Sequence, residues 1–348
     1  MTKALENDNE LIHAMLLGIN KVPEIYRPSP YWLAKTKNSA REILKFGLKD
    51  FRGSTNNIGT SYSDNGLVDV RGQYNYGLRL LLSILMKRAF PLSRIFDSQV
   101  RLTEKWFHET VKHKNVIANT SERVKELLEK FNMPNDTIRG GCLNYCDIKN
   151  KKIANHYLEL LHTHEILARH IDFKKARTYF EIGGGFGANL HLLIENYSNI
   201  RKVIYLDIMP NLYIGTQYLK SFYGKGVKTF FESSRLRKIS FSLGDELEIF
   251  CIAPHQIESL DVVIDIFQNS HSFVEMSSNI VKNYVKYIEK MTSPNNSAIG
   301  LISYDGGDEQ TLKPDSLPKY FSRKFMRYEE QTLWRHDRHN YYYVANSR

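Results

Sequence analysis

The feature that most constrains this chain is the run Tyr179-Phe180-Glu181-Ile182-Gly183-Gly184-Gly185-Phe186-Gly187. An apolar, β-prone segment leads into an acid and then into glycines at every second position, and helix-like sequence follows from Ala188 to Asn196. Twenty residues after Gly187, a second apolar run, Val203–Leu206, ends in Asp207. This order predicts a strand, a tight turn, a helix and a second strand around a nucleoside. Glycines let the backbone approach a ligand, and the acid can accept hydrogen bonds from a ribose diol.

Two nucleoside ligands fit these glycines differently. The dinucleotide fingerprint G-x-G-x-x-G/A is satisfied by Gly183, Gly185 and Ala188. The pattern acid-x-G-x-G-x-G is satisfied by Glu181, Gly183, Gly185 and Gly187, and it resembles the first motif of class I S-adenosylmethionine (SAM) methyltransferases. A pyrophosphate favours bare N–H groups with no anion nearby, whereas SAM carries a sulfonium and an ammonium. Glu181 therefore favours SAM over NAD, and a glycine-rich corner without any ligand is the third alternative.

Strands alternate with helices from Tyr179 onward, which argues for a parallel sheet built from βαβ units. The chain then ends with two strand-like runs, Phe325–Leu333 and Tyr341–Ala345, that have no helix between them. We therefore expect an α/β fold with a Rossmann-like, seven-stranded sheet of the class I methyltransferase kind, finished by an antiparallel hairpin. The expected strands are Tyr179–Ile182, Val203–Leu206, Leu247–Ala253, Leu260–Phe267 and Ile299–Tyr304. The expected helices between them are Asn189–Tyr197, Ile214–Phe222 and Phe273–Met291.

The length of 348 residues predicts two domains. Residues 1–150 are expected to be mainly helical and to recognise the acceptor, and residues 151–348 to form the SAM-dependent domain. A polar start, no apolar run of spanning length and three cysteines predict a cytoplasmic protein with free thiols and no membrane span. The net charge of +10 favours anionic partners in general, although the basic residues are interspersed with acids.

The carboxyl ends of the expected parallel strands mark the candidate site, because ligands of open α/β sheets bind there. The cofactor-binding candidates come from the glycine run, from the end of the second strand, where an apolar residue could pack on an adenine ring, and from two further strand ends. They are Glu181, Gly183, Gly184, Gly185, Gly187, Asp207, Ile208, Gln256 and Asn269.

Transfer of a methyl group to an alcohol needs a group that takes the hydroxyl proton. His271 is the candidate base, because a neutral imidazole suits that role at cytoplasmic pH. Glu275 is the second catalytic candidate: four residues further on, it is placed either to orient the imidazole or to bind a sugar hydroxyl. The alternatives are a capping or exposed histidine and an ordinary surface acid. Four histidines between His156 and His170 show no i,i+4 pair, so no metal is expected.

The strand-end segments together resemble a narrower group. Glu181–Gly187, Leu206-Asp207-Ile208, Pro254-His255-Gln256 and Asn269–Met276 are similar to the sugar O-methyltransferase family of bacterial surface-polysaccharide gene clusters, over about residues 140–348. The Ser-Phe-Val-Glu-Met run, Ser272–Met276, carries the narrower likeness. The resemblance implies SAM as cofactor and a sugar, nucleotide-sugar or glycan hydroxyl as acceptor, in polysaccharide biosynthesis.

Other acceptors stay open at this point. Nucleic acid is not expected, since the segment Gln268–His271 lacks the Asn/Asp-Pro-Pro-aromatic sequence of amino-group methyltransferases that act on nucleobases. Arg71, Tyr74 and Tyr76 lie in a polar, aromatic segment that suits sugar binding, with the arginine able to pair with a diphosphate. A small-molecule or protein acceptor, and a non-catalytic nucleotide-binding or glycan-binding module, are the alternatives.

Overall fold

The computed structural model describes residues 5–19, 22–52, 122–142, 145–293, 296–305, 312–333 and 339–346. The substrate-binding candidates Arg71, Tyr74 and Tyr76 lie outside this part of the chain. So do residues 78–90 and 103–114, for which the sequence also predicts helices.

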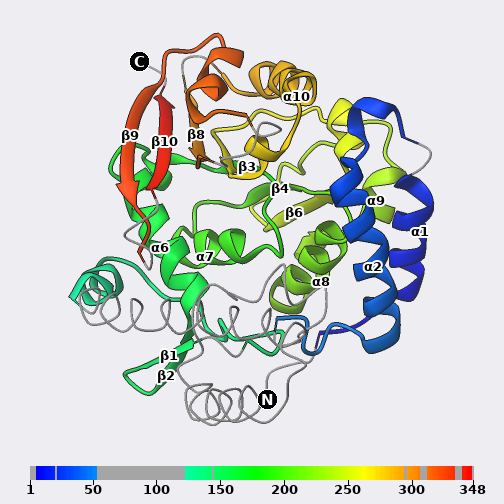
Figure 1. The fold of residues 1–348 in the computed structure, drawn as a ribbon, viewed down its shortest axis with the longest axis horizontal. Helices are drawn as coiled ribbons and strands as arrows, with labels where there is room; N and C mark the ends of the chain where they lie inside the picture. The colour runs from blue at the N-terminus through cyan, green and yellow to red at the C-terminus, as the bar shows by residue number, and fades with distance from the viewer. Residues whose placement is uncertain are drawn as a thin grey trace, which may run out of the picture.

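An eight-stranded mixed sheet forms the centre of the molecule (Figure 1), in the order β5-β6-β4-β3-β7-β8-β10-β9. The strands up to β8 pair in parallel, and β10 pairs antiparallel with both β8 and β9. Their bounds are β3 Thr178–Ile182, β4 Lys202–Leu206, β5 Val227–Lys228, β6 Glu248–Ile252, β7 Ile266–Ser270, β8 Ala298–Ser303, β9 Met326–Gln331 and β10 His339–Asn346. This order confirms the predicted fold class, with the two-residue strand β5 added at one edge as the eighth strand.

Side chains alternate between the two faces of the sheet, because successive residues of a strand point to opposite sides. In β3, Tyr179 belongs to the apolar cluster on one face, whereas Phe180 and Ile182 belong to the cluster on the other. The helices α6, α7 and α8 contribute to the first cluster and α10 to the second. The sheet is therefore covered on both faces, and ligands reach it only at the ends of the strands.

The helices packed on the sheet are α6 Asn155–Ala168, α7 Ala188–Asn196, α8 Asn211–Tyr223, α9 Phe230–Ser234 and α10 Ser278–Met291. Of these, α7 and α8 lie where the sequence predicts the helices Asn189–Tyr197 and Ile214–Phe222, whereas the short helix α9 was not predicted. Short 3-10 turns occur at η3 Phe173–Lys175, η4 Gly224–Gly226, η5 Pro254–Ser259, η6 Ser272–Glu275 and η7 Pro314–Tyr320.

Two expected elements differ from those observed. The strand expected at Leu260–Phe267 begins only at Ile266. The earlier apolar residues Leu260 and Ile264 are buried in the segment before the strand, where each forms only an isolated β-bridge. The helix expected at Phe273–Met291 is divided into η6 and α10, and Met276 between them is extended.

The N-terminal helices lie on two sides of the molecule (Figure 1). Beside α8 and α9 lie α1 Asn9–Ile19, η1 Glu24–Tyr26 and α2 Pro30–Phe46. A helix over residues 122–130 lies on the other side, where Arg123 and Lys130 form ion pairs with Glu165 of α6. The hairpin of β1 Tyr145–Ile148 and β2 Lys151–Ala154 then leads into α6, and its turn contains the proposed domain boundary at residue 150.

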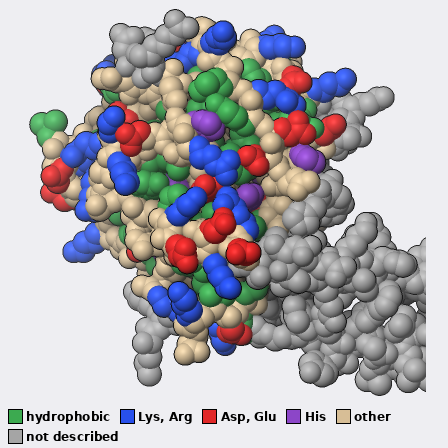
Figure 2. All heavy atoms as spheres, turned by 90° about the vertical axis from the view of Figure 1, so that its left-hand side faces the viewer, with side chains coloured by type: hydrophobic (Ala, Val, Ile, Leu, Met, Phe, Trp, Pro, Cys, Tyr) green, Lys and Arg blue, Asp and Glu red, His purple; other side chains and the backbone are tan. Residues whose placement is uncertain are grey.

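The surface that Figure 2 turns to the viewer shows Lys and Arg interspersed with Asp and Glu. Edge strand β9 carries Arg327, Glu329 and Glu330, and charges of this kind discourage pairing with another edge. Within the described ranges, no helix combines the length and apolar character needed to cross a membrane.

Candidate cofactor and acceptor site

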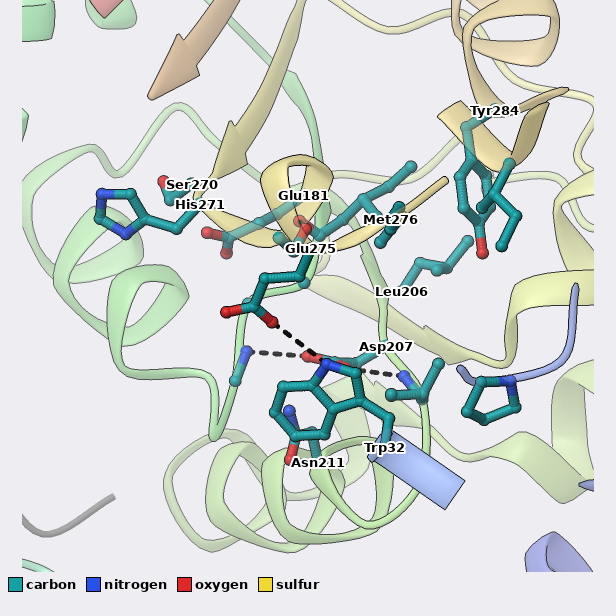
Figure 3. A pocket seen from close by; sticks show the side chains of 18 of the residues that line it. Trp32, Glu181, Leu206, Asp207, Asn211, Ser270, His271, Glu275, Met276 and Tyr284 are labelled. Atoms are coloured by element: carbon teal, nitrogen blue, oxygen red, sulfur yellow. Dashed lines mark hydrogen bonds between the residues drawn. The ribbon is translucent and has the colours of Figure 1, made fainter. Parts of the chain in front are cut away.

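A cavity of about 580 Å³ opens at the carboxyl ends of β3, β4 and β7. It lies where ligands of open α/β sheets bind, and its volume is in the range of small-molecule sites. Figure 3 shows its two ends, with Ser270 and His271 on one side and Leu206 and Tyr284 on the other.

Glu181 lies at the end of β3 and is almost completely buried, with 1% of its surface exposed. Asn189 of α7 donates a 2.9 Å hydrogen bond to its Oε1 atom, but Oε2 has no hydrogen-bond partner. Burial raises the pKa of the Glu181 carboxyl to about 8. A buried carboxyl with one unpaired oxygen lowers the stability of the fold unless a ligand forms a hydrogen bond with that oxygen.

The glycine loop forms a tight turn beside this carboxyl. Gly183 and Gly185 have φ angles of 78° and 61°, in the left-handed region that side chains disfavour. A Cβ atom on Gly183 would overlap the side chain of Ser272, and one on Gly184 would lie 2.8 Å from Glu181 Oε2. Gly187, with a φ of 85°, precedes α7. A Cβ on Gly187 would lie 3.0 Å from the Leu219 side chain, and this predicted cofactor residue is not among the described lining residues. Bare backbone at Gly183 and Gly184 keeps the space beside Glu181 open.

Asp207 follows β4 and is 5% exposed. Its two oxygens accept 2.8 and 2.7 Å hydrogen bonds from the backbone N–H groups of Gly185 and Ile208. These bonds fix the carboxyl against the glycine loop, and the Asn211 side chain is a third hydrogen-bond partner. A carboxylate has about four lone-pair sites, which leaves room for a ligand donor. Burial raises the pKa of Asp207 to about 7.

The predicted adenine neighbour Ile208 lines the same part of the cavity. Other apolar side chains gather at this end, and they are Ile25, Tyr26, Leu206, Met276, Ile280 and Tyr284. The cofactor candidates Glu181, Gly183, Gly184, Gly185, Asp207 and Ile208 are thus brought to one cavity.

Gln256 and Asn269 take no part in the described cavity lining. Gln256 caps η5, where its Oε1 accepts from the Ala253 N–H at 2.8 Å and its amide donates to Ser233 at 3.0 Å. Asn269 ties the end of β7 to β3 by donating to the Ile182 carbonyl at 2.9 Å. Both amides are committed to holding the strand ends in place.

His271 lines the opposite end of the cavity and adopts a left-handed backbone conformation with φ of 69°. Its N–H donates to the Ile302 carbonyl at 2.8 Å, and its imidazole Nε2 lies 3.2 Å from Asn340 Oδ1. The pKa of His271 is lowered, chiefly because of burial. The imidazole is therefore neutral near pH 7 and able to accept a proton.

Glu275 does not orient the imidazole of His271, which corrects one alternative raised by the sequence. Its Oε2 accepts a 3.1 Å hydrogen bond from Trp32 Nε1, and its Oε1 accepts one of 3.2 Å from the Tyr304 hydroxyl. Figure 3 shows Glu275 directed toward Trp32, away from His271. The short η6 turn separates the two side chains where a continuous helix was expected to stack them.

Sequence reasoning missed the N-terminal part of the lining. The residues Ile25, Tyr26, Arg27, Pro28, Ser29 and Trp32 all line the cavity. Tyr26 is fixed by a 2.7 Å hydrogen bond to Glu258, and Thr36 by one of 2.5 Å to the Met209 carbonyl. The local signal in this segment is the set of prolines Pro23, Pro28 and Pro30, which interrupt the helical sequence between α1 and α2. His156 and Leu160 of α6, also missed, line the cavity, with His156 near His271.

Acidic residues outnumber basic ones in the lining, unlike in the whole chain. Among the described lining residues, Glu181, Asp207 and Glu275 are acidic, and Arg27 is the one arginine or lysine. Across the described residues, no group of three or more His, Cys, Asp or Glu is arranged to hold a metal ion. The cavity therefore suits a ligand with positive charge.

No model of a protein family matches this sequence, and no curated protein matches it. Solved structures with a similar fold include the N-methyltransferase NodS from Bradyrhizobium japonicum, at 12% identity and a TM-score of 0.40, covering 56% of this chain and 98% of that one. The mitomycin 7-O-methyltransferase MmcR shares 12% identity with a TM-score of 0.35, covering 55% of this chain and 57% of MmcR. A SAM-dependent methyltransferase from Aquifex aeolicus shares 13% identity with a TM-score of 0.36, covering 55% and 94%. Likeness at this level establishes no activity for this chain.

Proposed function

We propose that this chain is a SAM-dependent methyltransferase. The observation that carries the proposal is the unpartnered Oε2 of buried Glu181 beside a glycine turn that leaves room for a ligand. A positively charged ligand would supply the missing hydrogen bond to Oε2, whereas the Glu181 carboxylate would repel the pyrophosphate of a dinucleotide.

The residues of the cavity fit the parts of SAM. Glu181 would accept from the ammonium of the methionine portion, and the backbone of Gly183–Gly185 would let that portion approach. Asp207 would accept from the ribose hydroxyls, with Ile208 against the adenine. When bound, SAM supplies an electrophilic methyl group on a sulfonium, and in-line transfer then depends mainly on alignment of the acceptor.

We further propose that the acceptor is a sugar hydroxyl, as the residue pattern of Asn269–Met276 suggests. The end of the cavity near His271 supports an alcohol acceptor, because the buried neutral imidazole can take the hydroxyl proton as the new bond forms. Residues 1–150 are proposed to recognise the acceptor, and the support is that Ile25–Ser29 and Trp32 already line the cavity. The second candidate is a small-molecule acceptor with an amino group, since its ammonium form would suit the acidic lining and would lose a proton before accepting the methyl group.

Binding of SAM is tested by calorimetry and thermal unfolding with SAM, S-adenosylhomocysteine and NAD in parallel. We expect both sulfur compounds to raise the unfolding temperature, since a ligand that binds only the native state stabilises it, and NAD to have no effect. A shift with NAD alone, or with none of the three, would contradict the proposal.

The sugar assignment is tested separately by mass spectrometry of the host's surface glycan with and without this chain. Loss of a methylated sugar supports it, and an unchanged methylation pattern contradicts it. For the base, His271→Ala is expected to slow turnover with little change in SAM affinity. Full turnover in that variant would exclude His271 from the role.

A further inference from the structure

Strand β10 places one polar side chain against His271, which lines the end of the cavity where we propose that the acceptor binds. Asn340 is 5% exposed, and its Oδ1 lies 3.2 Å from His271 Nε2. It belongs to the C-terminal hairpin, 69 residues beyond His271 in the sequence. Neither the glycine loop nor any other part of the predicted cofactor site reaches this nitrogen in the described structure.

The backbone around His271 leaves the imidazole little freedom. The left-handed conformation of His271 is held by the bond from its N–H to Ile302, and the ring packs edge-on against Tyr304, with centroids 5.5 Å apart. The imidazole therefore lies between Tyr304 and Asn340, at the point where β8 and β10 pair. Because the ring is fixed, the partner at Nε2 decides which nitrogen carries the proton.

We propose that Asn340 is a positioning residue, which accepts a hydrogen bond from Nε2–H of His271 and thereby leaves Nδ1 as the nitrogen that takes the acceptor proton. This inference rests on the proposed methyl transfer to a hydroxyl. In the step, the hydroxyl proton moves to Nδ1 while the oxygen forms its bond to the methyl carbon, whose former bonding pair stays on the donor sulfur. The imidazolium that results then has a hydrogen-bond acceptor at Nε2.

The groups around the imidazole are consistent with this assignment. His156 of α6 faces it, and a neighbouring positive charge there would oppose protonation of His271. Tyr304 follows β8, and its hydroxyl donates a hydrogen bond to Glu275 of η6. The Glu275 carboxylate is therefore bonded to Tyr304 and not to His271. Among the described residues, Asn340 is the side chain that forms a hydrogen bond with the His271 imidazole, and its amide is uncharged.

The test reads the tautomer directly, by nitrogen-15 NMR of protein labelled at its 12 histidines, with His271→Gln to identify the signal. We expect the wild-type ring to carry its proton on Nε2 at neutral pH. Asn340→Ala should give a mixture of the two tautomers. Asn340→Asp should raise the pKa of His271 by about 1–3 units, because an opposite charge at this distance favours the imidazolium.

Asn346→Asp is the matched control, since Asn346 lies on the same strand and donates to the His170 carbonyl without contacting His271. It should leave the tautomer and the pKa of His271 unchanged. A wild-type ring protonated on Nδ1, or an Asn340→Asp variant with an unshifted pKa, would overturn the inference. The wild-type spectrum decides even if a variant does not fold. If the tautomer is as expected but His271→Ala keeps full turnover, the positioning contact stands and the proposed base role fails.

Discussion

Glu181 and Asp207 end neighbouring parallel strands, and both carboxyl groups are buried in the wall of one cavity. Burial raises both of their pKa values, to about 8 and about 7. In the ligand-free protein these acids therefore hold protons at pH values where free carboxyl groups are charged. A cationic ligand reverses this preference, because it favours the carboxylate form.

The first prediction concerns pH. Between the ordinary pKa of 4.5 and about 8, folded Glu181 holds a proton that the unfolded chain has lost, so the stability of the ligand-free protein falls as pH rises through this range. SAM binding should release protons and strengthen from about pH 5.5 to about pH 7, by up to tenfold per pH unit for one linked proton. Calorimetry in buffers of different ionisation enthalpy measures the release, and Glu181→Gln should reduce it.

The second prediction concerns Asp207. Asp207→Ala should weaken SAM binding by about 10- to 100-fold, because each hydrogen bond to a charged acceptor contributes about 1.5–3 kcal/mol. Titration calorimetry measures the change. Asp172→Ala removes a carboxylate that also accepts a backbone N–H, at η3 outside the described cavity lining, and should leave SAM affinity unchanged. If Asp207→Ala binds SAM as tightly as the wild type and Asp172→Ala do, then Asp207 does not contact the ligand.

At the scale of elements, the glycine turn between β3 and α7 determines what the cavity can hold. Gly183→Ala combines left-handed strain of about 1–2 kcal/mol with overlap against Ser272, and should abolish SAM binding. Gly224→Ala is the matched control, because Gly224 also has a positive φ, of 53°, but a Cβ there meets nothing within 4 Å. That variant should lose stability, measured by chemical denaturation, while SAM affinity is retained. Unchanged SAM binding in Gly183→Ala would contradict the assigned role.

The elements also show what sequence could and could not predict. The run around Glu181 and the strand ending at Asp207 were predictable, because glycine spacing and apolar periodicity are local signals. The lining by Trp32 and Tyr26 was not, since it depends on long-range hydrogen bonds to Glu275 and Glu258. Asn340 was missed for the same reason, because its role follows from strand pairing. Gln256 was predicted at the cofactor and instead caps its own 3-10 turn.

At the scale of the whole molecule, the N-terminal helices and the sheet share one apolar core. Leu11 and Ile12 of α1 and Ile43 of α2 belong to the same cluster as Leu212 of α8, and Tyr213 accepts a hydrogen bond from the Asp8 N–H at 2.8 Å. We therefore expect a single unfolding transition in which calorimetric and van't Hoff enthalpies agree. Residues 151–348 expressed alone should aggregate, because the N-terminal cover of α8 is lost. Two separate transitions, or a stable fragment, would contradict this expectation.

The bond from Trp32 to Glu275 has a kinetic consequence. It joins an N-terminal helix to the turn after β7, across the cavity in which the spent donor would remain after transfer. We expect departure of that product to require movement of the segment Ile25–Trp32, so that release and not bond making limits the steady-state rate. A rapid-quench experiment would show this as a burst of one methylated product per enzyme molecule, followed by slower cycling. Trp32→Phe keeps an aromatic ring but loses the N–H that donates to Glu275. This variant should increase the rate of the slow phase and leave the burst unchanged.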